Sequence, residues 1–264
     1  METIGENLIQ VKKERSYISC LVKGCSYGFK HLGLLLRYIW PSLVLSVVLP
    51  IPFMFMFAAQ MDAILRKWIE LDYLPNVTLK SMRREIELCA NRSAIKVLIY
   101  AFWLFLTLFS FYLTIFLGLG RWWALLVFFL VWLLLLPLSV VIMQVSYSNI
   151  PIAECLKGGV KIAYRNFGKL FAFEFLSNLL ESIIVLLGGI PLLTLYAVSI
   201  QVHSSMVMGD VVDMPFALYG FCYVLAYVIC IFILLTILLV FSFSRCLMWG
   251  SLVNEVPTET EANS

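Results

Sequence analysis

Residues 97–143 read VLIYAFWLFLTLFSFYLTIFLGLGRWWALLVFFLVWLLLLPLSVVIM, and the only charged side chain among them is that of Arg121. Two apolar runs, 97–117 and 122–143, flank the short link Gly118–Arg121. As α-helices of about 21 and 22 residues, both runs match the roughly 30 Å hydrocarbon core of a bilayer. Because the link has turn chemistry and is very short, we expect an antiparallel pair of membrane helices.

Composition extends this conclusion to the whole chain. Of its 264 residues, 62% are hydrophobic and 13% are charged, whereas a soluble domain has about 45–50% apolar and about 25% charged residues. A water-soluble fold could not bury so much apolar surface. We therefore expect an all-α polytopic membrane protein with about four to six membrane segments and two amphipathic interfacial helices.

The first of these interfacial helices is expected near the N-terminus. Residues 1–16 are polar, and we expect them to be flexible. The following segment, 17–37, mixes apolar and polar residues, and its positive charges recur at seven-residue spacing, which places them on one helical face. These charges belong to Lys23, Lys30 and Arg37. The pattern predicts an amphipathic helix at the membrane surface.

An apolar run, 39–61, comes next, and it is interrupted near its middle by Pro50 and Pro52. Proline removes a backbone donor and bends a helix, so this run either spans with a kink or turns back. Residues 62–94 then mix basic and acidic side chains. We expect them to form a cytoplasmic segment.

The second interfacial helix is expected after the spans at 97–143. Its positive charges recur at four-residue spacing, which predicts contacts with anionic lipid headgroups. They belong to Lys157, Lys161, Arg165 and Lys169. Two further apolar runs follow, 170–200 and 216–244, and residues 251–264 are polar and expected to be disordered. We expect 17–250 to form a single membrane domain.

An offset of 135 residues aligns the two interfacial segments. It pairs Cys20 with Cys155, Gly24 with Gly159, Lys30 with Arg165, Gly33 with Gly168 and Leu35 with Leu170. Each segment then enters an apolar run that contains proline. This match suggests an internal repeat of 17–60 and 152–200, a feature of many membrane proteins, including transporters.

The distribution of Lys and Arg favours one topology over its alternatives. If 39–61 dips into the membrane and returns, every one of the 19 basic residues except Arg121 lies on the cytoplasmic side. This arrangement, with four spans, agrees with the positive-inside rule. If 39–61 crosses instead, the chain has five spans and its basic residues divide between both sides. A six-span arrangement is the third alternative.

The candidate polar site within the membrane consists of Glu174, Asn178 and Glu181. Their spacing places them on one helical face. Carboxylates inside a span are costly and usually face a partner or a water-filled path, which would suit a proton relay or a polar substrate groove. The alternative is that the interfacial helix continues along the membrane surface as far as Glu181, where all three side chains stay hydrated.

The chain lacks the sequence patterns of the common hydrolase, nucleotide-binding and metalloprotease sites, so we expect no enzymatic activity. Its seven cysteines have no zinc-type spacing, and we expect no metal and no cofactor. No block of basic residues predicts nucleic-acid binding. The expected partners are the lipid bilayer with its anionic headgroups, and either another protein or a second copy of this chain.

Two short motifs resemble a known family. Ala163–Leu170 reads AYRNFGKL and Tyr27–Gly33 reads YGFKHLG, and both look like the interfacial helix of the YciC-type polytopic inner-membrane proteins of bacteria. The resemblance implies a bacterial cytoplasmic (inner) membrane location and a helical bundle, and it brings no known reaction. The chain departs from that family by lacking a clear second span between residues 62 and 94.

Two functions therefore follow from the sequence. The first is a non-enzymatic membrane component with an assembly, regulatory or scaffold role. The alternative is a transporter or permease component that uses the stripe of Glu174, Asn178 and Glu181.

Overall fold

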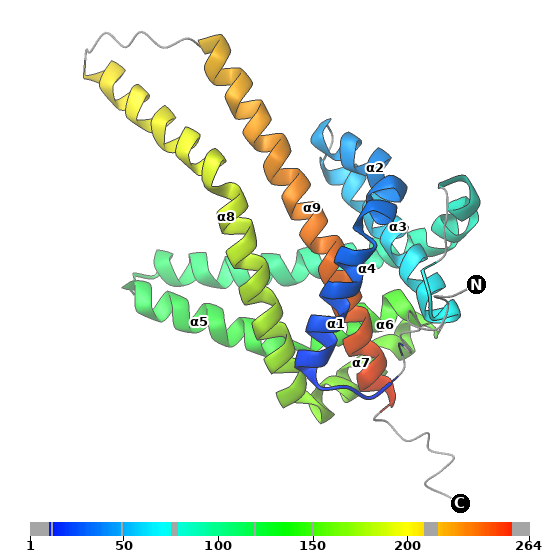
Figure 1. The fold of residues 1–264 in the computed structure, drawn as a ribbon. Coiled ribbons are helices and arrows are strands. Elements are labelled where there is room, and N and C mark those ends of the chain that lie inside the picture. Colours follow the sequence, from blue (N-terminus) through cyan, green and yellow to red (C-terminus); the bar gives the residue numbers. More distant parts are fainter. Residues whose placement is uncertain are drawn as a thin grey trace, which may run out of the picture. The chain divides into compact units, whose positions relative to one another are not determined.

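The computed structural model describes residues 11, 13–48, 50–74, 79–118, 120–148, 150–208 and 216–254. Within these ranges the regular structure is entirely helical, with no strand (Figure 1). The helices are α1 (Tyr17–Lys30), α2 (Leu32–Val48), α3 (Pro50–Leu71), α4 (Leu79–Phe116), α5 (Gly120–Leu135), α6 (Pro137–Tyr147), α7 (Ile152–Arg165), α8 (Phe167–Val207) and α9 (Phe216–Asn254). They group into two compact units: Met1–Phe175 with Val240–Ser264, and Leu176–Leu239.

Four stretches of helix are long and apolar enough to cross a membrane. They are Met82–Phe116, Trp122–Tyr147, Phe167–Val207 and Ala217–Val253. Large apolar side chains on these helices point outward, for example Phe105, which is 61% exposed. Such a surface requires an apolar solvent. The chain is an all-α polytopic membrane protein, as its composition predicted.

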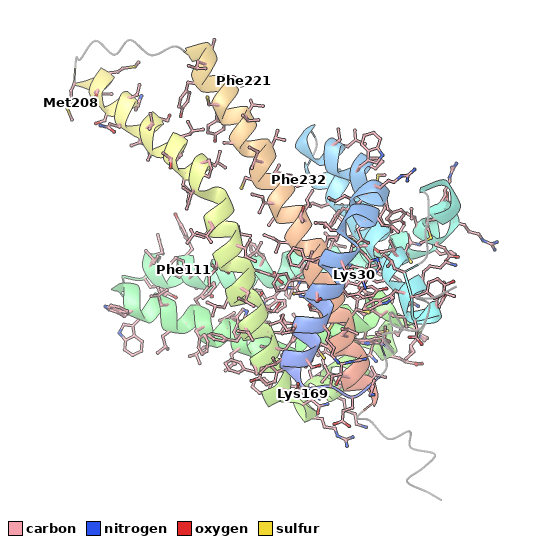
Figure 2. All side chains as sticks on the ribbon, in the orientation of Figure 1. Lys30, Phe111, Lys169, Met208, Phe221 and Phe232 are labelled. Carbon is pink, nitrogen blue, oxygen red and sulfur yellow. The ribbon has the colours of Figure 1, made fainter. Side chains whose placement is uncertain are left out.

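The expected antiparallel pair at the centre of the sequence is confirmed. Helices α4 and α5 lie side by side (Figure 1), and Phe111 of α4, labelled in Figure 2, packs edge-on against Phe128 of α5 with ring centroids 6.1 Å apart. Gly118 and Gly120 reverse the chain with φ values of 70° and 77°. Residues other than glycine are disfavoured there, because a Cβ clashes in this left-handed region.

The apolar run 39–61 does not form one continuous helix. It is divided between α2 and α3, which pack against each other as a helical hairpin (Figure 1). The Ser42 hydroxyl on α2 donates a hydrogen bond to the Gln60 side-chain oxygen on α3, which joins the two helices. This is the backbone path that the returning alternative predicted, although neither helix is among the candidate spans.

The expected cytoplasmic segment, 62–94, has no separate fold of its own. Its beginning completes α3, and its end forms the first part of α4, which continues without a break into the apolar span. A salt bridge of 3.3 Å between Lys67 and Glu85 joins the two helices. Residues 62–94 are rich in good helix formers, so their polarity did not by itself indicate a loop.

Where residues of the expected flexible segment 1–16 are described, they are held by α9. The Arg15 backbone N–H donates to the Ser251 hydroxyl at 2.9 Å, and that hydroxyl donates back to the Arg15 carbonyl at 3.1 Å. Helix α9 continues to Asn254, so the ordered chain extends beyond the expected boundary at residue 250. The rest of 1–16 and of the expected disordered tail, 251–264, lies outside the described residues.

The core of the first unit contains an aromatic cluster of Tyr27, Trp68 and Phe243, which come from α1, α3 and α9. The Tyr27 ring stacks on Trp68 with centroids 4.9 Å apart, and Trp68 lies 4.9 Å from Phe243. The Leu74 backbone N–H donates to the Tyr27 hydroxyl at 3.1 Å. Burial raises the pKa of this hydroxyl above its ordinary value, and the cluster joins the three helices.

The second unit is a hairpin made from the later part of α8 and the earlier part of α9. Gly188 lies so close to Ile233 that an added Cβ would be 2.9 Å from the Ile233 Cγ2 atom. The Tyr219 hydroxyl donates to the Leu195 carbonyl at 2.7 Å. Phe221 and Phe232, labelled in Figure 2, are 66% and 42% exposed on α9, as a lipid-facing surface requires.

Candidate functional site

Helix α7 packs on the rest of the first unit through one narrow face. The small and apolar side chains of this face are buried, and they belong to Cys155, Gly159, Ile162 and Ala163. Cys155 packs with Val141 and Val145 of α6 in a buried cluster. At Gly159, an added Cβ would lie 2.9 Å from the Val141 Cα atom, so the two backbones approach closely. Glycine therefore allows α7 to lie directly on α6.

The opposite face of α7 presents two adjacent rows of side chains. One row is apolar and consists of Leu156, Val160 and Tyr164, which are 43%, 37% and 61% exposed. The other row is basic, and its exposed members are Lys157, Lys161 and Arg165. Both rows repeat every four residues and so follow the helix axis. We call these six side chains the α7 surface.

The fourth predicted headgroup residue, Lys169, does not belong to the α7 surface. Helix α7 ends at Arg165 with Asn166 as its C-cap, and Lys169 lies near the start of α8 (Figure 2). Its ammonium group donates to the Ser251 hydroxyl at 3.3 Å, which ties α8 to α9. The four-residue spacing of the basic residues continues to Lys169 in the sequence. In the structure, however, a new helix begins at Phe167, so Lys169 does not lie on the same helical face.

The predicted polar stripe lies on α8 within a candidate span. Glu174 is 3% exposed and belongs to the first unit, whereas Asn178 and Glu181 are partly buried and belong to the second. Ser177 is fully buried, and its hydroxyl donates to a Glu181 carboxylate oxygen at 3.2 Å. The helix therefore does carry a buried carboxylate, and a second one that has a polar partner.

Sequence reasoning missed a charge cluster between α3 and α4. The carboxylate of Asp62 is 1% exposed, accepts a hydrogen bond of 2.6 Å from the Ser93 hydroxyl, and forms an ion pair with Lys96. The Lys96 side chain is 14% exposed. The sequence offered one indication of this cluster: Asp62 lies at the end of an apolar run, and Lys96 lies just before another. The two residues are 34 positions apart, so no helical repeat in the sequence indicates that they pair.

Two arginines of the same helices hold the connection between α6 and α7. Arg66 donates to the Ser146 carbonyl at 2.7 Å, and Arg92 donates to the carbonyls of Ser148 and Ile150. The last carbonyls of a helix lack partners within that helix and carry partial negative charge. Arg66 satisfies one of these carbonyls, at Ser146, and Arg92 binds the two carbonyls of the link that follows, so α3 and α4 fix the place where α7 begins.

The contacts of the described residues are the basis for assigning a function to this chain. No protein-family model, curated protein or solved structure matches this chain. Its function must therefore be argued from its own residues. The ion pair and the arginines are bound to other parts of the first unit, and the six side chains of the α7 surface are exposed.

Proposed function

We propose that this protein is a non-enzymatic membrane component, with an assembly, regulatory or scaffold role, that fixes its helix α7 to anionic lipid headgroups. The observation that carries the proposal is the α7 surface, which pairs an exposed apolar row with an exposed basic row. This surface lies on the helix that directly precedes the candidate span Phe167–Val207. The bacterial inner membrane, which the YciC-type resemblance implies, is part of the same proposal.

The physical chemistry of the α7 surface supports this function. An interfacial helix buries its apolar row at the boundary of headgroups and acyl chains, while its cationic row meets the phosphates. Each Lys or Arg close to an anionic membrane surface contributes about 1 kcal/mol of binding free energy. Tyr164 suits the same depth, because its ring is apolar and its hydroxyl is polar.

The test removes the three positive charges from the full-length protein. The variant Lys157→Gln/Lys161→Gln/Arg165→Gln is purified in mild detergent, and its retained lipids are counted by mass spectrometry. We expect a marked loss of anionic lipid and little change in zwitterionic lipid. The matched control is Lys13→Gln/Arg83→Gln/Arg84→Gln, which removes three exposed charges elsewhere. Equal retention of anionic lipid by both variants would contradict the proposal.

A transporter or permease component is the second candidate. It is favoured by Glu174, a carboxylate that is 3% exposed within a candidate span. Buried carboxylates in membranes are commonly part of proton or ion pathways. In liposomes loaded with a pH-sensitive dye, the wild-type protein should then conduct protons, and Glu174→Gln should stop that flux. An absence of flux from the wild type would remove this candidate.

A further inference from the structure

Helices α1 and α7 are equivalent in their bounds. Both contain 14 residues, Tyr17–Lys30 and Ile152–Arg165, and both ends differ by the offset of 135 that aligns the two sequences. Their C-caps, His31 and Asn166, keep the same offset. In each case a second helix starts directly after the cap residue, at Leu32 and at Phe167.

The buried positions of the two helices are equivalent as well. Cys20 and Cys155 are both 0% exposed, and so are Leu35 and Leu170 in the helices that follow. Gly24 lies on α9, where an added Cβ would overlap the Ser244 backbone, just as Gly159 lies on the Val141 backbone of α6. One aligned position therefore makes the same close helix contact in both places.

The packing partners are exchanged between the two halves of the sequence. Helix α1 belongs to the first half but packs on α9, the last helix, through Gly24 and through Gly28, whose added Cβ would lie 3.1 Å from the Val240 Cα atom. Helix α7 opens the second half but packs on α6, which ends the first. Each half thus supplies the surface on which the other half's short helix lies.

The outward faces correspond less closely, but they share one chemistry. Phe29 is 59% exposed and its counterpart Tyr164 is 61% exposed, and each is followed by an exposed cation, Lys30 or Arg165. Ile18 and Val22 add apolar surface on α1, with 51% and 60% exposure. Lys23 is also exposed, although its counterpart is Gly158 rather than a basic residue. Helix α1 therefore presents fewer charges than α7 on a similar apolar face.

We infer that α1 is a second helix that binds anionic lipid, equivalent by internal duplication to α7. Its contacts would be Lys23 and Lys30 with headgroup phosphates, and Ile18, Val22 and Phe29 with the boundary of the acyl chains. The inference rests on the proposed function of α7, because it extends the same kind of contact to the second copy. An anionic membrane surface is the partner that combines attraction for cations with space for apolar side chains.

The test places a photoreactive benzophenone side chain at Phe29, at Tyr164 or at Phe105 of the full-length protein. Phe105, 61% exposed on α4, reports lipid contact within a span. Each protein is embedded in nanodiscs of phosphatidylcholine mixed with phosphatidylglycerol, and the crosslinked lipids are identified. We expect the ratio of phosphatidylglycerol to phosphatidylcholine at Phe29 to exceed that at Phe105 by about fivefold.

Charge variants assign the enrichment to its helix. Lys23→Gln/Lys30→Gln should lower the ratio at Phe29 and leave that at Tyr164 unchanged, whereas Lys157→Gln/Arg165→Gln should do the opposite. A reporter at Ile18 replaces the one at Phe29 if that variant fails to fold.

Three outcomes would overturn the inference. Enrichment at Tyr164 but not at Phe29 would reject it and leave the proposed function intact. No enrichment at either position would reject both. Enrichment at Phe29 that survives Lys23→Gln/Lys30→Gln would show that α1 does not supply the binding charges.

Discussion

Single residues decide how closely the short helices approach their partners. Gly24 and Gly159 have the Ser244 and Val141 backbones where a Cβ would be, whereas Gly33 and Gly168 have nothing within 4 Å of that point. The two pairs are aligned by the same sequence offset. Glycine is therefore required sterically at the first pair and is replaceable at the second.

The first prediction compares alanine at these positions. Gly24→Ala and Gly159→Ala should each destabilise the protein by at least about 1–3 kcal/mol, because the neighbouring backbone must move. Gly33→Ala and Gly168→Ala should be neutral or slightly stabilising, because alanine is the better helix former. Thermal unfolding in mild detergent measures the difference. Similar losses from all four variants would refute this steric account.

The second prediction concerns the buried ion pair of Asp62 and Lys96. Asp62→Asn should destabilise the fold by about 3–5 kcal/mol, because Lys96 would keep a buried charge without its counterion. Asp62→Leu/Lys96→Met should recover much of that loss, since no charge is then left buried. Glu87→Gln breaks the exposed pair with Arg83 and serves as the control, with little effect expected. A double variant as unstable as Asp62→Asn would count against this explanation.

The third prediction concerns pH and His31. Burial, and next the charge of Lys30, lower the pKa of His31 below its ordinary value of about 6.5. As the pH falls through about 6.5, His31 binds a proton in the unfolded chain but not yet in the folded chain. The free energy of unfolding therefore decreases. His31→Gln should reduce this loss in unfolding curves between about pH 8 and pH 5. His203→Gln, at an exposed position of α8, should leave the loss unchanged.

At the scale of the elements, the hydropathy pattern predicted the helices that a long apolar run defines. It did not predict the features that depend on which residues contact each other. The runs 97–117 and 122–143 and the glycine turn between them were predictable, because one continuous pattern specifies each. The division at Asn166, which separates Lys169 from the α7 surface, was not, because periodic charge continues across it. The Asp62–Lys96 pair could not be found either, since it depends on the register of α3 against α4.

The fourth prediction tests how α7 is held. Arg92 bonds to the carbonyls of Ser148 and Ile150, and hydrogen bonds with a charged partner contribute about 1.5–3 kcal/mol. Arg92→Met should loosen the connection between α6 and α7 and make it a site of limited proteolysis. Arg83→Met removes an exposed arginine from the same helix and should leave cleavage unchanged. Equal protection of both variants would show that Arg92 does not hold this connection.

At the scale of the whole molecule, the described helices agree in number with the topology of four spans that the basic residues favour. The hairpin of α2 and α3 removes the single continuous helix that a simple fifth crossing would use. The same topology would make Arg121 the one basic residue on the outer side, and the neighbouring Trp122 and Trp123 are 84% and 62% exposed. Such aromatic residues are typical of the membrane interface.

The fifth prediction tests this topology with single cysteines in a chain freed of its seven native ones. In intact cells, an impermeant maleimide should label Trp122→Cys and Met208→Cys from outside and should not label Ser81→Cys. Ser81→Cys should react once the membrane is permeabilised, which shows that its thiol is accessible. External labelling at all three positions would reject the four-span topology.

The contact between α1 and α9 has a consequence for the order of events on the ribosome. Cys25 touches Ser244, 219 residues later, so this contact cannot form until almost all of the chain has been made, whereas the stacking of Tyr27 on Trp68 of α3 can form much earlier. At about 5–20 residues per second, that interval lasts roughly 10 to 45 s. Helix α7 meets α6 as soon as it emerges, because Gly159 and Val141 are close in sequence. The newborn protein thus completes the packing of its second short helix before that of its first, and the face of α1 that holds Gly24 and Gly28 stays uncovered until α9 has been made.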